Sequence, residues 1–274
     1  MTLLVRDEQD IIRENIEYHL AQGVSKIIAT DNRSVDQTTH ILKEYVDKGV
    51  LHLIYEGDDT YNQHEWVTRM AVMAYEEFGA DWVINNDADE FWWPKAGNLE
   101  ESLRSLPEDT DLIQAPRFNF VMLEQSDIPF HQAMIYREVK SLNSLGMPLP
   151  PKVAHRGSAN IKVAQGNHSV SGLRTSNMAT DLIEILHFPM RTTHQFTNKI
   201  KKGGAAYERN QRLSESVGAT WRTLYSEIMK RKNLNNYFAT HMYDNDRINA
   251  EIKNGRIVVD RRLADFFVHL YQDD

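Results

Sequence analysis

The sequence contains no cysteine, and this absence excludes disulfide bonds and thiolate metal sites from the 274-residue chain. It also lacks any apolar run of about 18 residues, the length that a membrane-spanning helix needs. No secretory signal is recognisable at the start of the sequence. Cysteine usage alone does not identify a compartment. We expect a cytoplasmic protein, with peripheral contact at the inner face of the membrane as an alternative.

Two glycine-rich signatures of phosphate binding are absent as well. No G-x-G-x-x-G follows the first apolar run, and no Walker lysine loop occurs anywhere in the chain. Dinucleotide oxidoreductases and P-loop enzymes are therefore disfavoured. A phosphate ligand would have to be held in another way, and a metal ion is the usual substitute.

Acidic and basic residues are distributed unevenly behind the net charge of -8. Residues 1–110 carry 23 acidic against 9 basic side chains, whereas residues 191–232 carry 10 basic against 3 acidic ones. The basic segment could meet phosphates or an anionic membrane surface, or it could be a solvated helix face. Nucleic acid is a less favoured partner because the acidic remainder would repel a long polyanion.

Short apolar runs alternate with helical patterns over the first hundred residues. Strands are predicted at residues 3–5, 26–32, 50–57 and 81–86, with helical stripes between them at residues 12–20, 41–46 and 67–78. Glycines end the helices, and Ser34 with Gln37 predicts a capping box before the second helix. The alternation predicts an α/β fold with a mainly parallel sheet and right-handed crossovers.

Acidic residues follow three of the predicted strands, where ligands of open α/β sheets bind. The segments are Asp7-Glu8, Asp31 with Asp36, and the cluster Asp87, Asp89 and Glu90. Carboxylates this close repel one another unless a proton or a cation neutralises them. A hard dication such as Mg²⁺ takes oxygen ligands, so the cluster predicts a metal site, with an exposed acidic turn as the alternative. An EF-hand fits poorly, because Trp92 stands where that loop needs glycine.

Six blocks of sequence occur in a fixed order: "LVRDEQDIIRENIEYHLAQGV", "ATDNRSVDQTT", "NNDADEFW", "PPKVAHRG", "QGNHSV" and "ILHFPMRTTHQFTNKIKKGGAAYERN". The first three resemble a family 2-type glycosyltransferase of the GT-A fold. The later three resemble the bacterial branch related to the family 92 galactosyltransferases. Together they cover most of residues 3–210. The resemblance implies a nucleotide-sugar donor, with a UDP-sugar favoured, a divalent metal (Mn²⁺ or Mg²⁺), and a glycan or lipid-linked saccharide acceptor.

The resemblance also assigns roles to single residues. Asp87 and Asp89 would hold the metal, and Asp87 would share its carboxylate with the ribose. His187 would be a further metal ligand. The residues that would contact the nucleoside or the diphosphate are Arg6, Asp31, Arg191 and Lys199. Ordinary structural roles remain open for these residues, above all a turn at Asp31 and solvation of the lysine.

An inverting transfer needs a carboxylate that deprotonates the acceptor hydroxyl. Glu124 and Asp181 rank first for this role, while Glu90, Asp127 and Glu184 stay open. No spacing rule chooses among them, and a retaining mechanism stays open too.

The resemblance predicts a GT-A catalytic domain at residues 1–192, with a nucleotide-binding half at 1–110 and an acceptor half at 111–192. Helical patterns dominate residues 193–274, which we expect to form a C-terminal extension packed on the same domain. We therefore expect a metal-dependent glycosyltransferase. A metal-dependent phosphohydrolase and a non-catalytic sugar-binding protein of the same fold are the alternatives.

Overall fold

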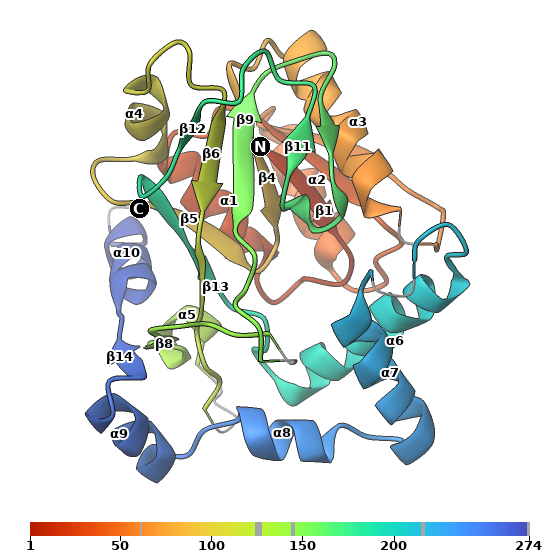
Figure 1. The fold of residues 1–274 in the computed structure, drawn as a ribbon, viewed down its shortest axis with the longest axis vertical. Coiled ribbons are helices and arrows are strands. Elements are labelled where there is room, and N and C mark those ends of the chain that lie inside the picture. Colours follow the sequence, from red (N-terminus) through yellow and green to blue (C-terminus); the bar gives the residue numbers. More distant parts are fainter. Residues whose placement is uncertain (61, 124–127, 144–145, 215–216, 273–274) are drawn as a thin grey trace. The chain divides into compact units, whose positions relative to one another are not determined.

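The chain is an α/β protein in its computed structural model, which describes residues 1–60, 62–123, 128–143, 146–214 and 217–272 (Figure 1). Its internal contacts divide it into two compact units. The first comprises Met1–Arg117 with Pro150–Leu186, and the second comprises Phe118–Leu149 with His187–Asp274. This grouping differs from the predicted boundary after residue 192, because the segment from 118 to 149 groups with the C-terminal helices.

The first unit opens with the predicted alternation of strands and helices. The elements are β1 (Thr2–Val5), α1 (Ile12–Ala21), β2 (Ile27–Asp31), α2 (Thr38–Asp47), β3 (Leu51–Tyr55), α3 (Gln63–Glu76) and β4 (Trp82–Asp87). Four further elements complete its framework: β5 (Glu90–Pro94), α4 (Leu99–Arg104), β6 (Leu112–Ala115) and β9 (Lys152–Arg156).

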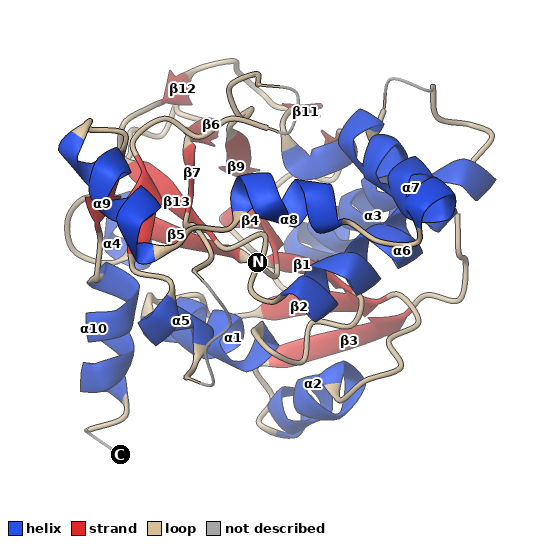
Figure 2. Cartoon of the chain, turned by 90° about the horizontal axis from the view of Figure 1, so that it is seen from below, coloured by secondary structure: helices blue, strands red, loops and turns tan. Residues whose placement is uncertain are grey.

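A seven-stranded sheet in the order β12-β6-β9-β4-β1-β2-β3 forms the centre of this unit, with β12 at Met178–Ala179. Strands β4, β1, β2 and β3 are parallel neighbours, as are β12 and β6. Only β9 runs antiparallel to its neighbours in this sheet, between β4 and β6. Figure 1 shows β9 in this central place, and Figure 2 shows β1, β2 and β3 side by side. The predicted α/β class with a mainly parallel sheet is confirmed.

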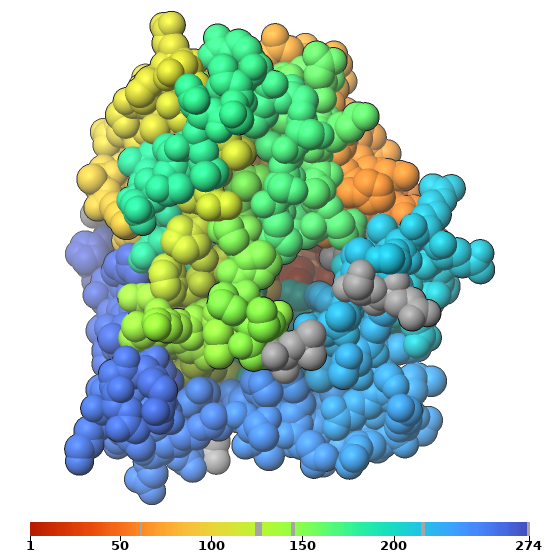
Figure 3. Space-filling model, in the orientation of Figure 1, coloured from red at the N-terminus to blue at the C-terminus, as the bar shows by residue number. Residues whose placement is uncertain are grey.

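Apolar faces of the helices pack onto this sheet. The buried stripe of α3 joins residues of β2 and β4 in one cluster, which contains Ile28, Val67, Met70, Ala71, Ala74 and Val83. The same cluster takes Ile161 and Val163 from the short hairpin of β10 (Lys162–Val163) and β11 (Val170–Ser171). In Figure 3 green, the colour of this hairpin, appears on the face of the molecule that is shown. The sheet is therefore buried on this face by α3 and the hairpin, as parallel sheets require.

The predicted capping box before α2 is wrong. The N-cap residue Gln37 makes no side-chain cap, and the backbone N–H of Thr38 donates instead to Asp36 Oδ1 at 2.9 Å. The Ser34 hydroxyl accepts a hydrogen bond from the backbone N–H of Asp7 at 3.0 Å. The Ser34 side chain thus joins the loops after β1 and β2 rather than capping a helix.

The second unit is mainly helical. It contains α5 (Phe130–Ala133), α6 (Thr193–Arg209), α7 (Ala219–Arg231), α8 (Asn235–His241), α9 (Asn245–Lys253) and α10 (Arg262–Leu270), with β8 (Tyr136–Glu138) paired to β14 (Ile257–Val259). One core cluster joins α6 and α7 through Phe196, Ile200, Leu224 and Ile228, and Tyr237 and Phe238 of α8 pack against it. Within the described ranges, no helix combines the length and apolar character that crossing a membrane requires.

Two more strands are β7 (Arg117–Asn119) and β13 (Ile183–His187). Strand β5 begins at Glu90, so it starts within the acidic cluster itself.

Candidate active site

The acidic cluster forms the turn between β4 and β5. Asp87 is the last residue of β4, Asp89 lies in the turn, and Glu90 is the first residue of β5. The sheet register pairs Val5 with Asp31 and Leu4 with Asp87. The carboxyl ends of β1, β2 and β4 are therefore aligned, as the sequence predicts. Asp31 and Asp87 are separated by two strand spacings, about 10 Å.

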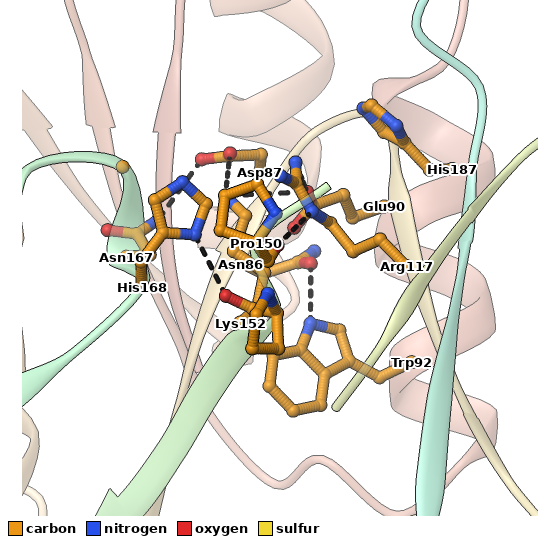
Figure 4. A network of polar contacts seen from close by, with 12 residues as sticks. Asn86, Asp87, Glu90, Trp92, Arg117, Pro150, Lys152, Asn167, His168 and His187 are labelled. Carbon is orange, nitrogen blue, oxygen red and sulfur yellow. Dashed lines mark hydrogen bonds and ion pairs between the residues drawn. The ribbon is translucent and has the colours of Figure 1, made fainter. Parts of the chain in front are cut away.

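A buried lysine pairs with two carboxylates of this cluster. The Lys152 ammonium forms an ion pair with Asp87 Oδ2 and lies 3.3 Å from Glu90 Oε1 (Figure 4). Its side chain is 1% exposed and that of Glu90 is fully buried, whereas the Asp87 side chain is 29% exposed. Buried charges persist only when they are paired. Lys152 therefore pairs with both carboxylates, and of these two side chains only that of Asp87 has an accessible surface.

Arg117 adds a second cation to the same network. Its Nη1 lies 3.1 Å from Glu90 Oε1, and its Nε donates to the Pro150 carbonyl at 3.0 Å. Two positive side chains thus face two carboxylates, those of Asp87 and Glu90. The geometry balances these four charges within the protein.

Neutral amides hold the other oxygen of Asp87. Asn167 Nδ2 donates to Asp87 Oδ1 at 3.1 Å, and Gln63 Nε2 lies 3.4 Å from the same atom. Gln63 is the first residue of α3, and its Oε1 accepts from the backbone N–H of Gly166 at 3.0 Å. Asn167 is fully buried and has a φ of 60°. A non-glycine residue in the left-handed region marks a tightly determined position, and here it directs an amide at Asp87.

Strand topology explains how these residues meet. β9 runs antiparallel to β4, with Ile84 opposite Ala154, so the start of β9 lies beside the end of β4. Lys152 is the first residue of β9, and it therefore reaches Asp87 from 65 positions further along the chain. β6 pairs Ala115 with Lys152, which places the end of β6, and Arg117 just beyond it, at the same edge.

Sequence reasoning missed Lys152, Arg117 and Gln63 as site residues. A lysine at the start of the apolar run "KVAH" was the available signal, because a charge there must be paired if the strand is buried. Nothing in the sequence specified which carboxylate would pair with it.

His168 lies beside this network as a neutral side chain. Its Nδ1 donates to the Pro151 carbonyl at 2.8 Å, since a carbonyl oxygen only accepts. Burial lowers the pKa of His168 to about 4, and the positive charges of Lys152 and Arg117 act in the same direction. His168 is therefore uncharged at neutral pH.

Helix α1 fixes the backbone of the acidic turn. Asn15 Nδ2 donates to the carbonyls of Ala88 at 3.0 Å and Glu90 at 2.9 Å. Asn15 Oδ1 accepts from Asn86 Nδ2 at 3.0 Å, and Asn86 Oδ1 accepts from Trp92 Nε1 at 3.0 Å. Asn15 and Trp92 are fully buried. A chain of buried amides therefore connects α1 to both sides of the turn.

His19 and Tyr18 extend the same network to β5. Tyr18 donates its hydroxyl to the Trp92 carbonyl at 2.9 Å. His19 Nδ1 donates to the Asn15 carbonyl at 2.7 Å, which leaves Nε2 as the acceptor that lies 3.4 Å from the Trp92 backbone nitrogen. Burial lowers the pKa of His19 to about 3. The imidazole is thus held as one neutral tautomer.

The two residues predicted to contact the nucleoside hold loops in place. Asp31 is 2% exposed, and its Oδ1 accepts from the backbone N–H of Ser34 at 3.0 Å while Oδ2 accepts from the Thr39 hydroxyl. Arg6 forms an ion pair with Asp59 at 2.5 Å. Both side chains lie at the ends of their strands, as predicted, and Asp31 fills the turn-forming role that the sequence left open.

The remaining predicted residues lie in several places. Asp89 is 4% exposed. In the second unit, His187 Nδ1 is 2.8 Å from Asn119 Oδ1, Arg191 is buried and donates to the Phe188 carbonyl at 3.0 Å, and Lys199 is half-buried in α6. Glu124 lies outside the described residues.

Asp181 is not brought to the Asp87 network. Its side chain is 86% exposed and lies 3.7 Å from Lys95 Nζ. Lys95 directly follows β5, and five residues of strand span about 16 Å from Glu90. This placement in the first unit gives the predicted role of Asp181 as a base no support.

Asp87 and Asp89 supply the donor chemistry that Mg²⁺ or Mn²⁺ prefers, because both offer carboxylate oxygens at one turn. Across the described part of the chain, no three His, Asp or Glu side chains are grouped to hold a metal ion. The residues therefore fit a dication that is bound by one or two carboxylates and completed by oxygens of a ligand, which is the usual pattern for Mg²⁺ with phosphates.

Replacing Asn15 by alanine should destabilise the protein. The change removes hydrogen bonds from two buried carbonyls and from Asn86, and we expect a loss of roughly 2–4 kcal/mol in the free energy of unfolding. Urea denaturation followed by circular dichroism measures it. The exposed Asn160 is a matched control, and Asn160→Ala should change stability by less than about 0.5 kcal/mol. Equal stability of the two variants would contradict the assigned role of Asn15.

His19 predicts how stability depends on pH. Its pKa is lowered from 6.5 to about 3 in the folded protein, so the unfolded chain takes up a proton first as the pH falls. Stability present above pH 6.5 is therefore lost progressively toward pH 3, by about 2 kcal/mol between pH 7 and pH 5 for this residue. His19→Gln should reduce the pH 7 to pH 5 loss by this amount in urea denaturation. The control is His40→Gln, which changes an exposed histidine and should leave the loss of stability between pH 7 and pH 5 as in the wild type. If His19→Gln also leaves that loss unchanged, the role given to His19 is refuted.

Comparison of the sequence with protein families identifies the family of this chain. The sequence profile of glycosyltransferase family 92 matches residues 2–162, more than half of the chain. No curated protein matches the chain. Among solved structures, residues 1–349 of S. aureus TarS are similar, with a TM-score of 0.44 and 14% identity over 84% of this chain and 70% of that one. The same fragment in complex with UDP-GlcNAc gives a TM-score of 0.42 and 15% identity over 87% and 74%. The extent of the family match shows that the chain is a glycosyltransferase and belongs to glycosyltransferase family 92.

Proposed function

We propose that this glycosyltransferase takes its sugar from a nucleoside diphosphate donor, with a UDP-sugar favoured, and transfers it with inversion to a glycan or lipid-linked saccharide. The observation that carries the proposal is the alignment of Asp31 and Asp87 at one edge of the sheet, with Asp87 held by side chains from three other elements. Ligands of open α/β sheets bind at this edge.

The chain's own residues support donor binding by preorganisation. Lys152, Asn167 and Gln63 fix both oxygens of Asp87 before any ligand arrives. Groups that are fixed in advance need not reorganise during the reaction, which is the main source of electrostatic catalysis. Arg6 and Asp31, at the ends of β1 and β2, are proposed to lie beside the nucleoside.

Asp87 and Asp89 are proposed to hold Mn²⁺ or Mg²⁺, and His187 is proposed as a further ligand. When bound, the metal would act as a Lewis acid that neutralises charge on the diphosphate leaving group. Arg191 and Lys199 are proposed to contribute positive charge to the diphosphate.

The transfer itself exchanges one bond for another. The acceptor hydroxyl oxygen bonds to the anomeric carbon, the bond from that carbon to the diphosphate breaks, and the diphosphate leaves with the electron pair. The hydroxyl proton passes to a carboxylate base, and the sugar passes through an oxocarbenium-like state. A lipid-linked acceptor would bring the basic segment 191–232 to an anionic membrane surface.

Donor binding should stabilise the protein only when a dication is present. A UDP-sugar at about 100 times its Kd should add about 2.7 kcal/mol to the free energy of unfolding. Thermal melting with and without Mn²⁺ measures this, and Asp89→Asn should abolish the shift. Asp47→Asn, an exposed residue of α2, serves as the control that keeps it. An equal shift without Mn²⁺, or in Asp89→Asn, would refute the metal role. Phosphate release from simple esters would favour a phosphohydrolase instead.

Two variants separate the predicted bases. A general base contributes about 10²–10⁴-fold to the rate, so its amide variant should lose kcat by that factor with little change in donor affinity. Because Asp181 is exposed and paired with Lys95, we expect Asp181→Asn to keep kcat within about threefold and Glu124→Gln to lose it. Steady-state kinetics with donor and acceptor decide the matter, and the opposite result would restore Asp181 as the base.

A further inference from the structure

The Lys152 ammonium occupies the position where a neutralising cation is expected, beside the partly exposed carboxylate of the acidic turn. We propose that Lys152 is a positioning residue whose fixed charge makes binding of the dication depend on the donor's diphosphate. This inference rests on the proposed metal-dependent function and concerns the order in which metal and donor bind.

The Lys152 ammonium cannot move away from Asp87. Its side chain is 1% exposed, and Glu90 Oε1 holds the ammonium at 3.3 Å from the buried side. Its backbone is fixed by pairing with Ala115 of β6. The ammonium therefore stays on Asp87 Oδ2 whether or not a ligand is present, and it acts on a ligand only through Asp87.

Two of the three carboxylates of the turn are already balanced without a metal. Lys152 and Arg117 balance Asp87 and Glu90 in a largely buried setting. A dication on Asp87 and Asp89 would share the Asp87 carboxylate with the ammonium. Its two positive charges exceed the one negative charge of Asp89, which leaves an excess of positive charge. Repulsion between like charges is strong where water is excluded, so the metal alone should bind weakly.

A diphosphate offsets this excess of positive charge. Its negative charges offset the excess left by the dication, and its oxygens complete the coordination that the described side chains leave incomplete. Metal and donor should therefore bind together, and the empty site should release free metal. Replacing Lys152 by a neutral residue should instead create a site that holds the dication without nucleotide.

Binding of Mn²⁺ alone tests the proposal, because electron paramagnetic resonance measures the free ion without any turnover. The wild type should bind Mn²⁺ weakly unless UDP is added. Lys152→Met should bind Mn²⁺ without nucleotide at least about tenfold more tightly than the wild type. Lys152→Arg keeps the charge and should behave as the wild type. Lys162→Gln, which removes an exposed lysine of β10, is the matched control and should change nothing.

A second readout covers the case in which Lys152→Met folds poorly. Lys152→Gln loses the charge but can still donate a hydrogen bond to Asp87, and it should also gain affinity for Mn²⁺. Thermal melting with Mn²⁺ alone should raise the Tm of either neutral variant and leave that of the wild type unchanged. If both neutral variants fold only when Mn²⁺ is added, that rescue supports the same conclusion.

The outcomes separate this inference from the proposed function. If the wild type binds Mn²⁺ with UDP, and the neutral variants gain no nucleotide-free affinity, the role of Lys152 is refuted and the metal-dependent function stands. If the wild type binds Mn²⁺ tightly without UDP, the role of Lys152 is refuted too. If Mn²⁺ fails to bind even with UDP, both proposals fall together.

Discussion

The ion pair between Lys152 and Asp87, shared with Glu90, is the interaction on which the site depends. A buried ammonium with one partner would be costly, and the two carboxylates without it would repel each other. The three side chains come from β4, β5 and β9, so the pair can form only when these strands are in register. The charge network therefore requires this strand register, and the paired charges in turn stabilise it.

The reversed strand β9 makes this possible. In an all-parallel sheet every strand would present its carboxyl end at the ligand edge, and its first residue would lie at the opposite edge. β9 runs the other way between β4 and β6, and its first residue, Lys152, therefore joins the carboxyl ends of its neighbours. The antiparallel strand in the sheet thus supplies a buried cation at the edge where Asp31 and Asp87 lie.

The sequence predicted the first half of the fold well because its signals are local. The α3 stripe of Val67, Met70 and Ala74 and the wholly buried β2 follow directly from helical period and apolar runs. Asp87 and Asp31 were found because strand ends are readable, and aligned parallel strands bring them to one edge. Ser34 was misread because its hydroxyl serves the loop after β1, a contact that no local pattern encodes.

Lys152, Arg117 and Gln63 escaped prediction for a different physical reason. Each meets Asp87 or Glu90 across a long separation in sequence. For Lys152 and Arg117, the antiparallel insertion of β9 decides the pairing. A lysine in an apolar run indicates only that some carboxylate must pair with it. Which carboxylate it meets depends on strand order, and strand order depends on packing of the whole unit. The local pattern can therefore identify the acidic residues at the sheet edge, whereas the basic residues that pair with them can be identified only once the sheet is assembled.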